Sequence, residues 1–137
     1  FYFVDTGLVF ALRKMLSIEL TEGTALFGDA FEHFIVLEVI KAIEYLGEEV
    51  DVSFFRTSDG AEVDLVLQKH GRVVPIEIKS STAPGIPSGL RSFLRDHEVH
   101  AAYCACRTPR PYAVENVTFL PWNALIENLY EGTLFDG

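Results

Sequence analysis

The sequence predicts an α/β (α+β) fold, in which helices flank a mixed β-sheet. Three observations support this class. A long helical pattern runs from about residue 25 to residue 46, and three strand patterns follow it within residues 50–81. A helix predicted at 89–96 then precedes a further strand at 100–106, which is the order of a crossover connection. We therefore expect an antiparallel meander joined to further strands in a mixed sheet.

The first helix carries a glutamate where an apolar residue is expected. The helix follows a polar break at 21–24 and ends at Gly47, a residue typical of helix C-termini. Glu32 falls inside the apolar arc of the helix, where an unpaired carboxylate is costly. We favour a functional role for Glu32, and a buried salt bridge with an arginine stays open as the alternative. The arc consists of Phe27, Phe31, Phe34, Ile35, Val39, Ala42, Ile43 and Leu46.

The two strands within residues 60–81 form a hairpin whose charged side chains are expected to share one face. Alternation places Glu62 with Asp64 on the first strand, and Glu77 with Lys79 on the second. If the turn between them has two or four residues, Asp64 lies opposite Glu77, and Glu62 lies opposite Lys79. Two carboxylates across a strand pair have Cβ atoms about 5 Å apart and repel each other unless a positive charge lies between them. A divalent cation meets this need.

The second half of the chain gives shorter elements. A Pro- and Gly-rich loop follows the hairpin, and Ser88 is the predicted cap of the helix at 89–96. Residues 107–116 are expected to form a loop with several prolines. A last strand is predicted at 117–120 and a last helix at 123–130.

Length and charge limit the kind of protein. The chain has 137 residues, of which 49% are hydrophobic, and this suits one domain with one core. The net charge of −9 argues against a free-standing binder of duplex DNA, because such binding depends on Lys and Arg contacts to phosphates. A DNA partner would need a local basic groove or a neighbouring domain. Cys104 and Cys106 are expected to be reduced and buried.

The start of the chain indicates a piece of a longer protein. The chain begins with Phe1 rather than Met, and its first residues are already apolar. We expect residues 1–20 to be a lead-in from a preceding region and residues 21–137 to be the domain. The most apolar run, at 34–46, is interrupted by charged residues, so we expect no membrane span and a cytoplasmic protein. The sequence leaves open whether the protein forms an oligomer.

The element order and the charged residues resemble those of the PD-(D/E)XK nuclease superfamily. The core of that superfamily is αβββαβ, the restriction-endonuclease-like fold, and its site is an acidic residue, a spacer and then E-x-K. Here Asp64 is followed, after twelve residues, by Glu77, Ile78 and Lys79. The shared face of the charges and the apolar strand around the motif strengthen the match. Glu32 strengthens it further, because many members of the superfamily use a glutamate on the first helix.

The resemblance implies a role for each of these residues. Asp64 and Glu77 would bind Mg²⁺ or Mn²⁺, with the backbone carbonyl of Ile78 as a further ligand. Glu32 would act as an outer-sphere or second-metal ligand. Lys79 would hold or help to deprotonate the attacking water and would stabilise the developing charge. The implied activity is that of a hydrolase, a metal-dependent endonuclease or exonuclease acting on DNA.

Four segments resemble, more specifically, the uncharacterised C-terminal domain that follows the ATPase in a family of bacterial and archaeal AAA+ type proteins. They are YFVDTGLVFAL, LFGDAFEHFIVLEVIK, SFFRTSDGAEVDLVL and VVPIEIKSS, and FLPWNAL near the C-terminus is similar as well. This resemblance implies that the ATPase domain of the same longer chain is a partner. The ATP-binding pattern G-x-x-x-x-G-K-[ST] does not occur in the 137 residues.

The sequence leaves three interpretations of the charged residues open. The first is an active nuclease, in which Glu62 raises a question because a cross-strand pair with Lys79 would compete with the role of that lysine. The second is a catalytically silent interaction or regulatory module of the ATPase that keeps the nuclease fold. The third is a charged cluster on a solvated sheet face. We rank it last, because the apolar first helix must cover the sheet.

Overall fold

The structure, a computed structural model, describes residues 25–47 and 49–136. The predicted lead-in at 1–20 lies outside the described residues. The helices are α2 (Ala25–Leu46), α3 (Ser88–Asp96) and α4 (Trp122–Glu131), followed by the 3₁₀ helix η1 (Thr133–Phe135). The strands are β1 (Asp51–Arg56), β2 (Glu62–Lys69), β3 (Arg72–Ile78), β4 (Tyr103–Cys106), β5 (Tyr112–Val114) and β6 (Val117–Pro121).

The strands form one mixed sheet in the order β1-β2-β3-β4-β6-β5. β1, β2 and β3 make an antiparallel meander, β4 runs parallel to β3, and β6 runs parallel to β4. Helix α3 forms the crossover between the parallel strands β3 and β4, as such a connection requires. The α/β class with a mixed sheet is therefore confirmed, and the elements from α2 to β4 follow one another in the order αβββαβ.

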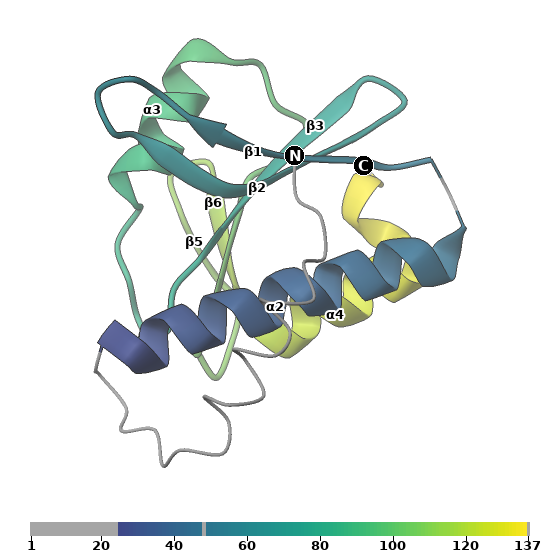
Figure 1. The fold of residues 1–137 in the computed structure, drawn as a ribbon, viewed down its shortest axis with the longest axis horizontal. Helices are drawn as coiled ribbons and strands as arrows, with labels where there is room; N and C mark the ends of the chain where they lie inside the picture. The colour runs from purple at the N-terminus through teal and green to yellow at the C-terminus, as the bar shows by residue number, and fades with distance from the viewer. Residues whose placement is uncertain (1–24, 48, 137) are drawn as a thin grey trace.

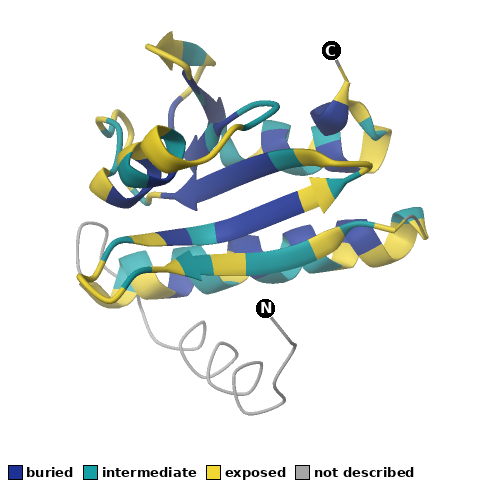
Figure 2. Cartoon of the chain, turned by 90° about the horizontal axis from the view of Figure 1, so that it is seen from above, coloured by how far each residue is buried: buried dark blue, intermediate teal, exposed yellow. Residues whose placement is uncertain are grey.

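Helices cover both faces of the sheet. α2 and α4 lie side by side across one face (Figure 1), where they pack on Leu65 and Leu67 of β2. α3 covers the opposite face, where Leu90 packs with Cys104 and Phe119. Burial is accordingly concentrated in the middle of the central strands, and the ends of the hairpins are exposed (Figure 2). Because both faces are packed with apolar side chains, a charged group on these strands is tolerated only near a strand end.

The turn between β2 and β3 sets the register of the hairpin. His70 has a φ of 49° and Gly71 a φ of 78°, and two consecutive left-handed residues are typical of a two-residue type I′ turn. The pairs run from the turn as far as Leu65 and Ile76. Their residue numbers add to a constant, so the predicted register is confirmed. Asp64 and Glu77, the two predicted ligand carboxylates of the hairpin, come directly after the last of these pairs.

Two predictions about burial and hydropathy agree with the structure. Cys104 and Cys106 are free and buried on β4. Burial raises the pKa of both thiols, so they are poor nucleophiles. Among the described residues, no helix has the length and apolar character needed to cross a membrane.

Three predicted boundaries are wrong. Residues 107–116 do not form a loop throughout, because Tyr112–Val114 forms the edge strand β5, which is too short and too close to prolines to give an alternating pattern. β4 begins at Tyr103 rather than at His100. Ser88 does not cap α3 but is its first residue, because extended Pro87 takes the capping position without a side-chain hydrogen bond.

The predicted inner face of α2 is also partly wrong. Phe34 was expected to face the core, yet it is 38% exposed and lies edge-on against Trp122 of α4. Val36 is buried instead. The difference arises because α2 packs against two partners, the sheet and α4, so its buried surface is wider and rotated relative to an arc that fits the sheet alone.

Candidate functional site

The strands β2 and β3 hold their carboxylates through each other's backbone. The N–H of Asp64 donates to Oε1 of Glu77 over 3.3 Å, and the N–H of Ile78 donates to Oδ2 of Asp64 over 2.8 Å. Each carboxylate thus accepts from a backbone N–H of the opposite strand. A hydrogen bond to a charged group contributes about 1.5–3 kcal/mol, so these bonds fix both side chains. We call Asp64, Glu77 and Ile78 the fork.

A bulge in β2 lies at the fork. β1 pairs through Ser53 with Val66 and through Phe55 with Val63, so one residue of β1 faces two residues of β2, of which Asp64 is one. As a result, Val63 and Val66 pack in the same cluster on the α3 side, which strict alternation would not allow. Bulges redirect side chains next to functional sites. The regular alternation expected along β2 is therefore interrupted where the first carboxylate stands.

The fork opens into a pocket that contains all four predicted catalytic side chains. Its volume is about 290 Å³, and its walls come from α2, from both strands of the hairpin and from the start of α3. Glu77 is almost fully buried, at 5% exposure, whereas Lys79 is exposed. We call this space the acidic pocket. It is lined by Glu32, Gly60, Glu62, Asp64, Glu77, Lys79, Pro87, Ser88 and Gly89.

Burial and repulsion raise the pKa of two carboxyl groups in the acidic pocket. The pKa of Glu32 rises from 4.5 to about 8, first because of burial and then because of a hydrogen bond to Asp64 and repulsion by it. The pKa of Glu77 rises from 4.5 to about 9 for the same causes in the same order. Lys79 offsets these effects only in part. Near neutral pH, Glu32 and Glu77 therefore keep their protons, and a bound cation would favourably take the place of these protons.

Glu62 is paired away from Lys79. Its carboxylate lies 2.9 Å from the guanidinium of Arg56 on β1, which is its cross-strand neighbour. Both side chains are more than half exposed, so the pair contributes at most about 1 kcal/mol to stability. In this structure Glu62 therefore pairs with Arg56 and not with Lys79, so it does not compete for that lysine. Alternation in the sequence alone did not indicate this partner.

Helix α3 approaches the acidic pocket closely because residue 89 is glycine. A Cβ atom at Gly89 would lie 1.8 Å from the carbonyl oxygen of Glu62 and 2.8 Å from its backbone nitrogen. Any side chain at this position would force α3 and β2 apart. Gly89 was not among the predicted site residues, and the only signal in the sequence was a glycine at the start of a helical pattern.

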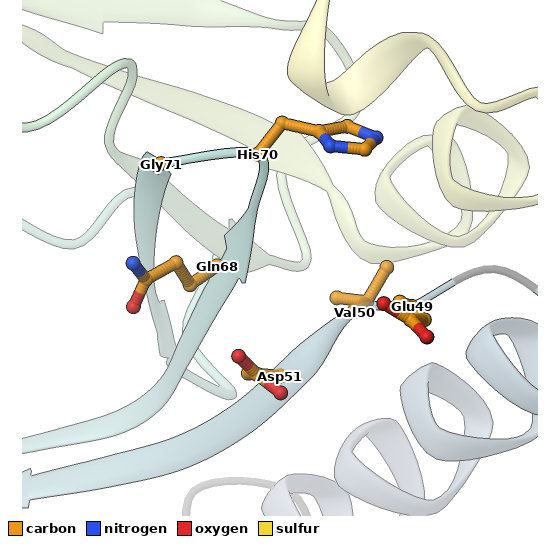
Figure 3. A pocket seen from close by; sticks show the side chains of 6 residues that line it. All are labelled: Glu49, Val50, Asp51, Gln68, His70 and Gly71. Carbon is orange, nitrogen blue, oxygen red and sulfur yellow. The ribbon is translucent and has the colours of Figure 1, made fainter.

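A larger pocket lies at the opposite end of the hairpin and contains none of the predicted residues (Figure 3). Its volume is about 470 Å³. Asp51 and Gln68 are neighbours across β1 and β2 there, and Figure 3 shows His70 directed away from them. The polar side chains of this pocket diverge, so we place the candidate site at the acidic pocket. The larger pocket is lined by Glu49, Val50, Asp51, Gln68, His70 and Gly71.

A family model described as "Domain of unknown function (DUF4143)" matches residues 27–125, which is more than half of the chain. The chain belongs to the DUF4143 family. Domains of this family are often linked to ATPases, which agrees with the predicted resemblance to an ATPase-associated domain. The matched segment contains the whole acidic pocket. Neither the curated proteins nor the solved structures include a significant match to the chain.

The chemistry of the DUF4143 pocket fits a hard cation such as Mg²⁺. This ion prefers oxygen ligands, and it is usually bound by one or two carboxylates together with several waters. The backbone bonds of the fork engage one oxygen of Asp64 and one of Glu77, and each carboxylate has a second oxygen outside these bonds. As the side chains stand, no group of three or more His, Cys, Asp or Glu residues within 25–47 and 49–136 is arranged to hold a metal ion. The residues therefore fit an ion held by two carboxylates and water.

The raised pKa values predict that the cation-free domain loses stability as the pH rises. Between pH 4.5 and about 8, the folded protein keeps protons on Glu32 and Glu77 that the unfolded chain releases. Folding therefore takes up protons in this range, and the free energy of unfolding falls as the pH increases. We expect a lower urea midpoint at pH 8 than at pH 5.5 in the presence of a chelator.

The variants Glu32→Gln and Glu77→Gln separate this effect from general repulsion in an acidic protein. Each should reduce the difference between the two midpoints, because glutamine does not titrate. A matched control is Glu49→Gln, outside the acidic pocket, which should leave the difference unchanged. If the urea midpoint of the double variant Glu32→Gln/Glu77→Gln depended on pH as strongly as that of the wild type, the effect could not be assigned to these two carboxyl groups.

The contact at Gly89 predicts a specific loss of stability. Gly89→Ala should destabilise the fold by about 1–3 kcal/mol, because the new methyl group meets the backbone of Glu62 and neither segment can yield easily. Gly85→Ala is the matched control, since a Cβ there meets nothing within 4 Å. Urea unfolding of both variants tests the contact, and equal stability of the two would rule it out.

Proposed function

We propose that this DUF4143 domain hydrolyses phosphodiester bonds of DNA with the help of Mg²⁺ or Mn²⁺. The observation that carries the proposal is the fork, in which Asp64 and Glu77 are held by reciprocal hydrogen bonds to the opposite strands. Glu32 and Lys79 line the same pocket. Buried carboxylates held in this way are costly without a function or a compensating cation.

The residues of the pocket would divide the work. Asp64 and Glu77 would bind the cation, and the backbone carbonyl of Ile78 is proposed as a further ligand. A bound Mg²⁺ supplies an activated water and stabilises negative charge on the phosphate. Lys79, at the exposed side of the pocket, would hold the attacking water and stabilise the charge that develops on the phosphoryl oxygens. Glu32 would assist through its hydrogen bond to Asp64.

The charge of the chain sets conditions on the substrate. A net charge of −9 opposes the approach of DNA over most of the surface. We therefore propose that an ATPase domain in the same longer chain supplies much of the DNA affinity. We further propose that the protein works in the cytoplasm. Supercoiled, single-stranded and branched DNA are the substrates to be tested, because together they detect both endonuclease and exonuclease cleavage.

Cleavage assays test the proposed activity. The wild-type domain, alone and with its ATPase domain, should cut at least one DNA form in Mg²⁺ or Mn²⁺. Asp64→Ala and Lys79→Ala should each reduce the rate by about 100-fold or more, because each removes a group that acts on the reacting atoms. Asp51→Ala, which changes a carboxylate in the larger pocket, should cut at the wild-type rate. Absence of cleavage in every form, with the ATPase present, would refute the proposal.

The second candidate function is a catalytically silent module that regulates or binds an ATPase. Two observations favour it: the acidic charge, and the absence among the described residues of three side chains arranged to hold a metal ion. Calorimetric titration with Mn²⁺ separates the two functions. A site that is lost in Asp64→Asn and in Glu77→Gln supports the enzyme, whereas no binding in the wild type supports the silent module.

A further inference from the structure

Two aromatic pairs join α2 to α4, and three of their four rings are exposed. Phe34 of α2 meets Trp122 of α4 edge-on, with ring centroids 5.7 Å apart. Further along both helices, Tyr45 meets Tyr130 edge-on at 5.2 Å. Tyr45 is 76% exposed, and Phe34 and Tyr130 are each 38% exposed. Aromatic rings held in pairs but left open to water are typical of interaction surfaces.

Phe34 and Tyr45 lie on the same side of α2, whereas Trp122 and Ile126 of α4 are partly buried and also pack against the core. Phe34 and Tyr45 are eleven residues apart, which places them about 20° apart around the axis of α2. Trp122 and Tyr130 are eight residues apart on α4, and Ile126 lies midway between them. Figure 1 shows the two helices side by side along this line. We call these five residues, together with Glu38 and Lys41 between the aromatic pairs, the α2/α4 seam.

The middle of the seam is charged. The Nζ atom of Lys41 lies 3.0 Å from Oε1 of Glu38 in the same helix. The side chain of Lys41 is 65% exposed and that of Glu38 is 24% exposed, so both charges can be reached from outside. The seam therefore consists of aromatic rings at each end with one base and one acid between them.

The order of these groups is symmetric along each helix. On α2, positions 34 and 45 are equally far from a point between 39 and 40, and so are positions 38 and 41. On α4, positions 122 and 130 are equally far from Ile126. A two-fold axis that lies in the plane of the seam, perpendicular to the helices, exchanges the two ends of each helix. It thereby places an aromatic pair against an aromatic pair and an acid against a base.

We propose that the α2/α4 seam binds a second copy of this chain in an antiparallel, two-fold symmetric dimer. Glu38 of each copy faces Lys41 of the other, and Phe34 of each copy faces Tyr45 of the other. At the centre, the two Ile126 side chains meet. A surface whose charges match only after a two-fold rotation is self-complementary, which is the requirement for an interface between identical subunits.

The size of the seam predicts a weak dimer. About an axis between residues 39 and 40, α2 overlaps its copy over residues 33–46, which is about 21 Å, and α4 overlaps over about 15 Å. Each helix is about 10 Å wide, so the footprint is on the order of 400 Å² per copy. Stable interfaces bury about 800 Å² per partner. We therefore expect reversible association in the micromolar range rather than an obligate dimer. The acidic pocket stays open in this arrangement, since Glu32 and Phe34 are about 160° apart around α2.

Sedimentation velocity of the 137-residue chain tests the proposal. Between about 5 µM and about 300 µM, the average sedimentation coefficient of the wild type should rise toward the value of a dimer. Glu38→Lys and Lys41→Glu should each stay monomeric, because the first places two bases against two bases and the second places two acids against two acids. An equimolar mixture of these two variants should associate at least as strongly as the wild type.

Two further variants complete the test. The double variant Glu38→Lys/Lys41→Glu restores opposite charges across the axis and should dimerise again. Tyr45→Ala should weaken the dimer at least tenfold, while Val114→Ala, which changes an exposed apolar residue on β5, should not. Circular dichroism should show the same fold for all variants, because Lys41, Tyr45 and Val114 are exposed and Glu38 is partly exposed.

Three outcomes would overturn the proposal. The first is a monomeric wild type at every concentration, which would mean that the seam has no partner or serves a different one. The second is dimerisation of either single charge variant alone. The third is a mixture of the two charge variants that fails to associate, because the acid and base would then not face each other across the axis.

Discussion

The backbone hydrogen bonds that hold the carboxylates of Asp64 and Glu77 across the hairpin are the constraint on which the rest of the site depends. The carboxylate of Glu77 accepts from the N–H of Asp64, and the carboxylate of Asp64 accepts from the N–H of Ile78, the residue after Glu77. Neither carboxylate can move without leaving a partly buried N–H unsatisfied. An orphaned buried N–H costs about 1–3 kcal/mol. The register of the hairpin is therefore tied to the placement of the carboxylates, and the two-residue turn at His70 and Gly71 fixes that register from the other end.

The neighbouring elements convert this constraint into a pocket. α2 supplies Glu32 from the side, and α3 comes close to β2 because Gly89 has no side chain. The bulge in β2 gives Asp64 a direction that a regular strand would not. Three carboxylates then share a space in which Lys79 only partly offsets their repulsion. This cost falls at the end of the strands, where the apolar core already gives way to solvent.

Much of this arrangement could be predicted from the sequence, because it follows from periodicity. The register of the hairpin could be predicted once its turn was taken to have an even number of residues. The inward position of Glu32 could be predicted from the helical period of α2. The missing features depend on contacts between distant segments. The bulge and the Arg56–Glu62 pair require knowledge of how β1 pairs with β2, and the contact of Gly89 requires the position of α3. β5 was missed because three residues carry too little pattern and the strand is formed by pairing with β6.

Helix α2 carries its buried apolar side chains and Glu32 on its inner side and Phe34 and Tyr45 on its outer side, so its pattern of apolar residues is broader than one contact needs. Ile35, Val39 and Ala42 are fully buried against the sheet and α4. Glu32 lies on the side of the acidic pocket, near the start of the helix, and Tyr45 lies on the outer seam near its end. A helix covering a sheet in a solvated domain would place charged residues on its outer face. Phe34 and Tyr45 stand there beside Glu38 and Lys41, while Glu32 is turned toward the fork. One departure places aromatic rings on the outer side of α2, and the other places an acid on its inner side. A more apolar composition of the helix would explain only the first, so each feature calls for its own explanation in binding.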